Sequence, residues 1–484
     1  MNQRHLAVFL CLLVLAVVGV ADDTPGMFGG THGRNMVSSA TGLPAEWDAD
    51  TGANILWRQP LGSQSYGGPV LAGPNIYVGT NNEGGRNPEI TGDKGNVMAF
   101  RAETGEFLWQ SAHGKLTSGR VHDWPLQGVC SAPYVEGDRL YYVNNRAELI
   151  AADVEGFRDG QNDGPVMDEA LSSEIDEDVI WKLDMIGDLA VFPHNLAVGS
   201  PLIVGDLIFT VTGNGVDEGH LTIPSPKAPS FIAVDKNTGK VVWASDAPGN
   251  GILHGSWSNP AYGVVDGQAM VVFPGGDGWL YAFEPASGEL LWKFDCNPKG
   301  SIWELGGMGT RNNIVSTPVI EGGRVYIGVG QDPEHGEGEG NLWVIDATQR
   351  GDITETGAIW HFGGEEFGRT ISTTAIHDGL VYIADLSGFL YCLDDATGEL
   401  LWTYDAFAAI WGSAFVADGK VYLGDEDGDI AVLEAGREMK LLAEINLGSS
   451  VYTTPIARDG VLYIASRNTL FAIKEGAQLA GSAQ

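Results

Sequence analysis

Apolar and polar residues alternate in short runs along the chain, and the runs are joined by tight turns. The segment "LYCLDDATGELLW" at 390–402 reads as a strand, a turn and a second strand that ends on tryptophan. Similar phrases are "LYAFEPASGELLW" at 280–292, "FIAVDKNTGKVVW" at 231–243 and "VMAFRAETGEFLW" at 97–109. A period of two on both sides of a glycine turn predicts a β-hairpin. We call its strands C and D.

A second phrase precedes each of these hairpins, and it predicts two further strands, A and B. It consists of a small residue, an apolar stretch, a turn and a β-branched strand, as in "STPVIEGGRVYIGV". Its eight copies begin at Pro69, Pro133, Pro201, Pro260, Pro318, Thr374, Ala414 and Pro455. The last intervals are 40 and 41 residues. Four strands in about 40 residues are typical of a propeller blade, so we expect an all-β fold.

The ends of the repeat region predict how the ring closes. The final unit, 451–473, supplies strands A, B and C but no strand D. The phrase "DTGANILW" at 50–57 resembles a strand D with no strands before it. Joining the two leaves no unpaired sheet edge. We therefore predict an eight-bladed β-propeller of four-stranded antiparallel blades, in which an N-terminal strand at residues 53–59 closes the last blade.

Outside the repeats, the beginning of the chain reads as a secretory signal. Arg4 precedes the apolar run Leu6–Val20, which is too short for a spanning helix, and small residues follow where a signal peptidase would cut. Cys11 lies inside this run rather than at its end, which argues against a lipoprotein anchor. We divide the chain into a signal peptide (1–21), a lead-in segment (22–49), the propeller (50–475) and a flexible tail (476–484). The expected location is periplasmic or extracellular.

The tryptophans of the D strands carry a family resemblance. They are Trp57, Trp109, Trp181, Trp243, Trp292, Trp360 and Trp402. The segment "AVDKNTGKVVW" matches the pattern A-x-D-x-x-T-G-x-x-x-W, so the chain resembles the quinoprotein, or PQQ-like repeat, propellers. In that family the tryptophans form a docking girdle between blades. The resemblance implies the fold but not an activity, because the family includes both pyrroloquinoline-quinone dehydrogenases and a cofactor-free outer-membrane assembly lipoprotein.

Charge and cysteine usage exclude several functions. The chain has 27 Lys and Arg against 63 Asp and Glu, a net charge of −36, so nucleic acid and anionic membranes are not expected partners. After the signal, Cys130, Cys296 and Cys392 lie far apart, without zinc or covalent-haem spacing. We predict that they form no disulfide. The acidic turn "GDEDGD" at 424–429 lacks a distal glutamate, so we interpret it as a hairpin turn and assign no metal site.

The longest insertions predict the functional face. They fall in the D-to-A and B-to-C connections, which emerge on one face of a propeller, whereas most A-to-B turns are short. Loops gathered on one face of a rigid ring are where a ligand site is built. The candidate ligand-binding residues in these connections are Trp124, His194, His254, Trp257, Trp303, Arg311 and Trp411. Each tryptophan could instead pack only its own loop, and Arg311 could tie its loop to the backbone.

These observations favour an exported, monomeric propeller that acts as a ligand- or protein-binding module. The alternative is a quinone-dependent alcohol or sugar dehydrogenase, with pyrroloquinoline quinone and calcium as cofactors. The large alcohol-oxidising members carry two adjacent cysteines over the quinone, and this chain has no adjacent pair. No catalytic residue can be assigned from the sequence. A solute-binding or polysaccharide-associated propeller is a third reading.

Overall fold

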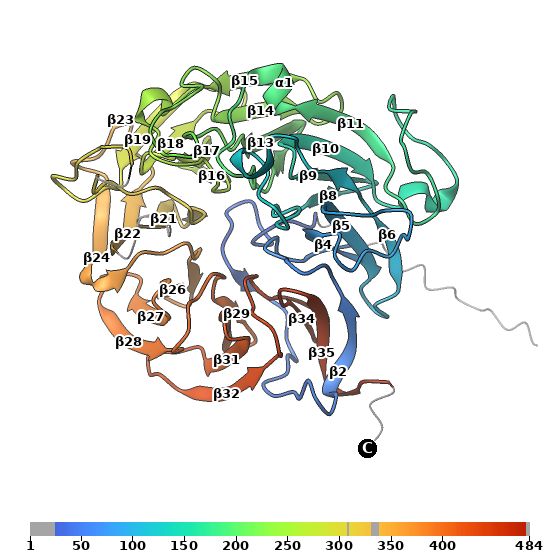
Figure 1. Ribbon diagram of the computed structural model, residues 1–484. Helices are drawn as coiled ribbons and strands as arrows, with labels where there is room; N and C mark the ends of the chain where they lie inside the picture. Colours follow the sequence, from blue (N-terminus) through green and yellow to red (C-terminus); the bar gives the residue numbers. More distant parts are fainter. Residues whose placement is uncertain (1–24, 307–308, 331–337, 481–484) are drawn as a thin grey trace, which may run out of the picture.

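The computed structural model describes residues 25–306, 309–330 and 338–480. Eight small antiparallel sheets stand around a central axis, as predicted from the repeats (Figure 1). In each blade the innermost strand is A and the outermost is D. The short apolar B and C strands are buried because they lie in the middle of a blade and between two neighbouring blades.

The first four blades follow the chain order. Blade 1 contains β3 (Val70–Ala72), β4 (Asn75–Asn81), β5 (Lys94–Arg101) and β6 (Phe107–Gln110). Blade 2 contains β8 (Tyr134–Glu136), β9 (Arg139–Val143), β10 (Glu148–Asp153) and β11 (Val179–Asp184). Blade 3 contains β12 (Leu202–Val204), β13 (Leu207–Val211), β14 (Phe231–Asp235) and β15 (Val241–Ser245). Blade 4 contains β16 (Ala261–Val265), β17 (Gln268–Pro274), β18 (Trp279–Phe283) and β19 (Leu290–Asp295).

The other four blades complete the ring. Blade 5 contains β20 (Val319–Glu321), β21 (Arg324–Val329), β22 (Glu339–Asp346) and β24 (Ala358–Gly368). Blade 6 contains β25 (Ala375–His377), β26 (Leu380–Ala384), β27 (Phe389–Asp394) and β28 (Leu400–Asp405). Blade 7 contains β29 (Phe415–Ala417), β30 (Lys420–Gly424), β31 (Asp429–Glu434) and β32 (Leu441–Asn446). Blade 8 contains β33 (Ile456–Arg458), β34 (Val461–Ala465), β35 (Thr469–Gln478) and β2 (Ala53–Pro60).

Short elements decorate this plan. Three two-residue strands extend blades 1, 4 and 7: β7 (His113–Gly114), β23 (Gly351–Asp352) and β1 (Val37–Ser38). The helical segments of the described chain are α1 (Met185–Leu189), η1 (Gly119–Val121), η2 (Gly156–Asp159) and η3 (Gly249–Gly251). In the described residues, no helix has the length and apolar character to cross a membrane.

The N-terminal strand closes the ring as the repeat count predicted. Strand β2 pairs antiparallel with β35, from Pro60 opposite Thr469 to Ala53 opposite Gln478. Strand β35 therefore continues beyond the propeller boundary drawn at residue 475. Because both ends of the chain share one blade, the sheet edge that an open ring would expose is paired.

The D-strand tryptophans join neighbouring blades. The indole N–H of Trp57 in blade 8 donates to Ala102 O in blade 1 at 2.9 Å, and Trp402 in blade 6 donates to Gly436 O in blade 7 at 2.9 Å. Trp109, Trp181, Trp243 and Trp360 make the same bond to the C-to-D turn of the next blade. This confirms the girdle and explains its repeat spacing.

The glycine of the repeat lets each indole lie flat on the next turn. A Cβ at Gly288 would stand 2.7 Å from the Trp243 ring, and a Cβ at Gly398 would stand 2.7 Å from the Trp360 ring. Trp292 is the exception. It is fully buried, but its indole nitrogen has no hydrogen-bond partner among the described residues. Here the strand β23, inserted in the C-to-D connection of blade 5, pairs with β19 at Trp292 itself.

The lead-in segment crosses the centre of the ring, which the sequence did not predict. In Figure 1 this blue segment runs between the innermost strands, and β1 pairs parallel with β29 of blade 7. Arg34 is fully buried at the centre, where its guanidinium donates to the carbonyl oxygens of Phe28, Pro201 and Pro260 at 2.7–3.0 Å. Burial lowers the pKa of Arg34 to about 9.

Two other predictions can be compared with the structure. Cys130, Cys296 and Cys392 are free, as predicted. The turn at 424–429 joins β30 to β31, and the Asp425 carboxylate accepts from the backbone N–H groups of Asp427, Gly428 and Asp429, so it is a hairpin turn. The predicted signal peptide lies outside the described residues.

Candidate functional site

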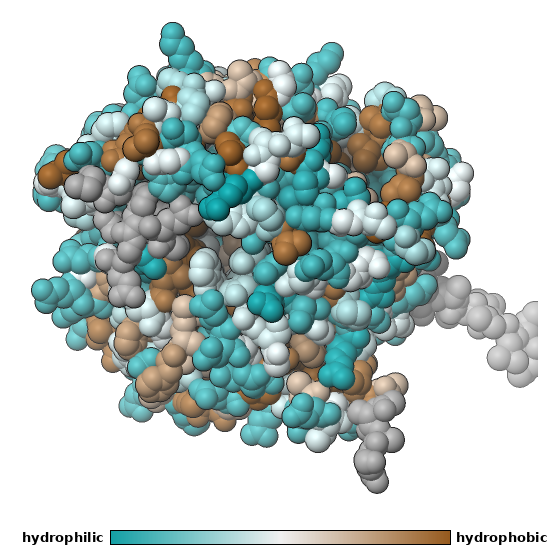
Figure 2. Space-filling view, viewed as in Figure 1, coloured by the Kyte–Doolittle hydropathy of each residue, from teal (hydrophilic) through white to brown (hydrophobic). Residues whose placement is uncertain are grey.

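A cavity of about 510 Å³ opens at the mouth of the central channel. Trp124, Trp257 and Trp411 line it together, and each comes from a different D-to-A connection. The repeats therefore bring three of the candidate residues, far apart in sequence, to one place. Figure 2 shows the face of the propeller that is seen in Figure 1, with a hollow near its centre.

Eight equivalent positions of the repeat form the wall of this cavity. In every blade, the residue four positions before the first residue of strand A lines the cavity. These residues are Tyr66, Cys130, Val198, Trp257, Val315, Ile371, Trp411 and Tyr452. The aligned repeats contain this signal, whereas the predicted site residues follow from the residue types in the long connections. The other lining residues are Phe28, Gly68, Trp124, Gln127, Ala132, Asn195, Leu196, Ser200 and Asn259.

The wall is aromatic in part and carries no charge. The rings of Tyr66 and Tyr452 stack, with centroids 4.9 Å apart and an interplanar angle of 8°, and Trp411 packs edge-on against Tyr452 at 5.7 Å. Burial raises the pKa of Tyr66 above its usual value and raises the pKa of the Cys130 thiol to about 12, so both are neutral at physiological pH. The cavity presents apolar surface with hydroxyl, amide and thiol groups.

The lead-in segment bounds the cavity on the inner side. Phe28 lines this cavity and also a second one of about 520 Å³, which the lead-in forms with blades 1, 7 and 8. Phe28 therefore lies between the two spaces. Because the hydrogen bonds of Arg34 fix the Phe28 carbonyl, the floor of the cavity is tied to the buried centre of the ring.

His194 and His254 meet behind the cavity wall. Both are fully buried, and their ring centroids lie 4.3 Å apart. His194 stacks on Trp257 at 5.8 Å, and the Trp257 indole N–H donates to the carbonyl oxygens of His194 and Leu196 at 3.2 and 3.1 Å. His220, which the sequence analysis did not select, joins them from the B-to-C loop of blade 3. The three imidazoles are the described residues best suited to hold a metal.

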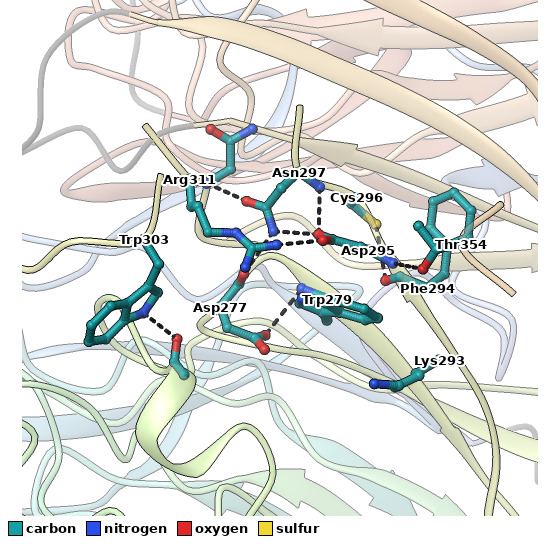
Figure 3. Close-up of polar contacts among 12 residues, drawn as sticks. Asp277, Trp279, Lys293, Phe294, Asp295, Cys296, Asn297, Trp303, Arg311 and Thr354 are labelled. Carbon is teal, nitrogen blue, oxygen red and sulfur yellow. Dashed lines mark hydrogen bonds and ion pairs between the residues drawn. The ribbon is translucent and has the colours of Figure 1, made fainter. Parts of the chain in front are cut away.

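Trp303 and Arg311 are not among the residues that line the cavity. Trp303 is 41% exposed, and its indole N–H donates to Gly251 O at 2.9 Å. Arg311 forms an ion pair with Asp295 at the end of β19, as Figure 3 shows. This contact holds the connection after blade 4 against its own blade. Sequence alone could not distinguish this loop-tying geometry from a ligand contact.

Asp277 is buried beside this ion pair. The Tyr281 hydroxyl and the Trp279 backbone N–H donate to its carboxylate at 2.7 and 3.1 Å. Burial raises the pKa of Asp277 to about 7, and these hydrogen bonds together with the Arg311 charge oppose the rise. These contacts close the B-to-C turn of blade 4, which is a structural role.

The comparisons with known proteins agree with the repeat pattern. The PQQ_2 family model, described as outer membrane protein assembly factor BamB, matches residues 20–118, 93–351 and 339–438. The chain belongs to this family. A relative, the outer membrane protein assembly factor BamB of Yersinia pestis, is 24% identical over 385 residues, with 78% of this chain and 80% of the relative covered.

Two further relatives are named as enzymes. The chain is 23% identical to tetrathionate hydrolase of Acidithiobacillus ferrooxidans over 42% of its own length, and 23% identical to polyvinylalcohol dehydrogenase of a Sphingopyxis species over 64%. It spans 38% of the length of the hydrolase and 50% of the length of the dehydrogenase.

Solved structures share the fold at low identity. BamB from Moraxella catarrhalis aligns with a TM-score of 0.52 and 15% identity, covering 87% of this chain and 97% of that one. Quinohemoprotein alcohol dehydrogenase from Comamonas testosteroni aligns with a TM-score of 0.51 and 12% identity, covering 95% and 82%. These likenesses support the fold and do not choose between a scaffold and an enzyme.

The donor set of the cavity does not fit a quinone cofactor. Pyrroloquinoline quinone is a polycarboxylate, and its calcium ion takes oxygen ligands that include carboxylates. Among the described residues that line the cavity there is no Asp, Glu, Lys or Arg. A polyanion placed there would lose its hydration without gaining a cation or a charge-assisted hydrogen bond.

Proposed function

We propose that this propeller is an exported binding module whose cavity at the channel mouth takes a small, uncharged and largely apolar ligand. The observation that carries the proposal is the ring of eight equivalent positions, none of them charged. A cavity of about 510 Å³ has the size of a small-molecule site, for which the general range is about 300–1,000 Å³.

The distribution of side chains around the ring supports a flat ligand. Aromatic residues stand at the blade 1, 4, 7 and 8 positions, and smaller residues stand at the other four. A planar apolar group could stack on the adjacent aromatic residues of blades 7, 8 and 1 while its remaining surface contacts Val198, Val315 and Ile371 across the ring. Gln127, Asn195 and Asn259 supply neutral hydrogen-bonding groups that would orient it.

The signal-like first 21 residues support export, and the acidic surface supports the exclusion of nucleic acid. The names of the relatives point to both candidate readings: an assembly factor is consistent with a protein partner, and a dehydrogenase with a small molecule. We place quinone-dependent oxidation second, because the uncharged wall does not favour the quinone. We expect the protein to be a monomer.

The neutral dye Nile red, whose fluorescence rises in apolar surroundings, tests the proposal. We expect saturable binding to the purified protein and at least about a tenfold weaker affinity in Trp411→Ala, since stacking and apolar burial are lost together. Trp303→Ala is the matched control, because Trp303 lies in another D-to-A connection but outside the cavity wall.

Equal affinities in the two variants would show that the dye binds elsewhere and would contradict the proposal. A parallel titration with pyrroloquinoline quinone and calcium, followed by absorbance, separates the two readings. We expect no saturable spectral change. A saturable change that is lost in Trp411→Ala would favour the quinone reading instead.

A further inference from the structure

Three histidines from three different loops converge beside the cavity wall. His194 lies in the D-to-A connection before blade 3, His220 in the B-to-C loop of blade 3 and His254 in the D-to-A connection before blade 4. One ring nitrogen from each can be chosen so that all three atoms lie within 4.8 Å of one another. Their spacing in the sequence matches no short ligand motif, so the sequence analysis assigned no metal here.

The tautomer of His194 is fixed by its surroundings. His194 Nδ1 lies 2.9 Å from Val216 O, and because a carbonyl oxygen only accepts, Nδ1 carries the proton. In the neutral ring, Nε2 then carries a lone pair. That lone pair accepts the Asn195 side-chain N–H, with Nδ2 3.1 Å away, and His220 Nε2 lies 3.0 Å from the same atom, so a bound metal ion would take the place of the amide contact. A ligating histidine whose second nitrogen donates to a backbone carbonyl is the usual arrangement at protein metal sites.

Backbone pairing holds the three loops together. Phe192 O accepts from Gly215 N at 3.0 Å, His194 N donates to Gly213 O at 3.1 Å, and Val216 N donates to His254 O at 3.2 Å. Gly215 is required for this approach, because a Cβ there would stand 2.5 Å from His254 O. The imidazoles of His194 and His254 therefore stand on a small irregular ladder rather than on independent loops.

The loop that presents His220 is closed by its own carboxylate. Asp217 accepts from the backbone N–H groups of Leu221 and Thr222 at 2.7 and 3.0 Å, and from the Thr222 hydroxyl at 2.9 Å. Within this turn His220 has a φ of 55°, in the left-handed region that costs free energy for a residue with a side chain. The turn points its ring toward His194, with ring centroids 4.7 Å apart.

We propose that His194, His220 and His254 bind a divalent transition-metal ion, for which Zn²⁺ is the representative. Three neutral imidazoles suit zinc, with Zn–N bonds of about 2.0–2.1 Å, which place tetrahedral ligand atoms about 3.3 Å apart. The separation of 3.0 Å between His194 Nε2 and His220 Nε2 is close to that value. A fourth ligand completes the tetrahedron, and the three imidazoles leave that position to another group.

The site adjoins the cavity through two lining residues, Asn195, whose side-chain amide contacts His194, and Trp257. The Trp257 ring forms part of the cavity wall and packs edge-on against His254, with centroids 4.7 Å apart. A metal ion bound by the histidines would fix this wall residue. The inference does not depend on the proposed ligand, since metal binding is measured without it.

The test is titration of chelator-treated protein with Co²⁺, followed by displacement with Zn²⁺. We expect one equivalent of Co²⁺ to give the visible absorption of a four-coordinate ion, and Zn²⁺ to abolish it. His220→Gln, on the least buried of the three histidines, should weaken Zn²⁺ binding at least about tenfold, as even loss of an outer-shell partner does. His377→Gln, on β25 of blade 6, is the matched control and should bind Zn²⁺ as the parent does.

Thermal melting gives a second measurement. We expect Zn²⁺ to raise the Tm of the parent and of His377→Gln but not that of His220→Gln, because only a native-state site stabilises the fold on binding. Absence of saturable Co²⁺ binding to the parent would overturn the proposal. Equal Zn²⁺ affinity in the His220→Gln and His377→Gln variants would do the same, since the ion would then be bound by other groups on the acidic surface.

Discussion

Trp109 and Trp292 form a natural pair for measuring what the girdle hydrogen bond contributes. Both side chains are fully buried in the same position of their blades. The Trp109 indole N–H donates to Val154 O at 2.9 Å, whereas the Trp292 indole nitrogen has no partner among the described residues. Replacing each with phenylalanine removes the same ring area, so the loss of packing is similar in the two variants.

The hydrogen bond makes the loss of unfolding free energy differ between the two variants. Trp109→Phe loses a bond worth about 1 kcal/mol, while Trp292→Phe removes a buried unpaired donor whose desolvation costs about 1–3 kcal/mol. We therefore expect Trp109→Phe to be less stable than Trp292→Phe by about 2–4 kcal/mol. Urea unfolding measures this difference, provided that the slopes of the transitions agree. Equal losses, or a greater loss at Trp292, would refute the account of the girdle.

Three further predictions follow from buried groups. Trp402→Ala should lower the free energy of unfolding by about 3–5 kcal/mol, the usual cost of truncating a buried aromatic side chain to alanine. Its affinity for Nile red should stay unchanged. Thermal melting and dye titration measure the two effects. Arg34→Met should destabilise by at least about 2 kcal/mol in urea unfolding, because buried carbonyl oxygens lose their donors, and an unchanged urea midpoint would contradict the central role of the lead-in. Burial raises the pKa of Glu177 to about 8, so the folded state keeps a proton that the unfolded chain releases above about 4.5. The stabilising effect of this retained proton is therefore present at low pH and lost as the pH rises from about 4.5 to about 8. Glu177→Gln should become more stable relative to the parent between pH 5 and 8. A difference in urea midpoint that stays constant over this range would argue against the raised pKa of Glu177.

The repeat pattern predicted the features that depend on local sequence. Each blade has its own alternating strands and glycine turn, so the blade number, the closing strand β2 and the tryptophan girdle could be derived by aligning the copies. The eight cavity positions follow from the same alignment. Tyr66 and Tyr452 lie in short connections, so insertion length does not point to them, although they occupy the same repeat position as Trp257 and Trp411.

The remaining features depend on contacts between segments far apart in the chain. The lead-in has no repeat and no alternation, and it is held by Arg34, whose four acceptor carbonyls belong to the lead-in and to blades 3 and 4. The histidine cluster requires three loops to meet, which no spacing in the sequence encodes. Arg311 lies in the expected connection, but an ion pair with Asp295 turns it onto its own blade.

The central claim, that the uncharged ring at the channel mouth is the ligand site, is tested most directly by a crystal structure of the protein with Nile red. The account predicts difference density between Trp124, Trp257 and Trp411, with the dye stacked against the aromatic side of the ring. Density confined to the opposite face, where the A-to-B and C-to-D turns lie, would contradict it.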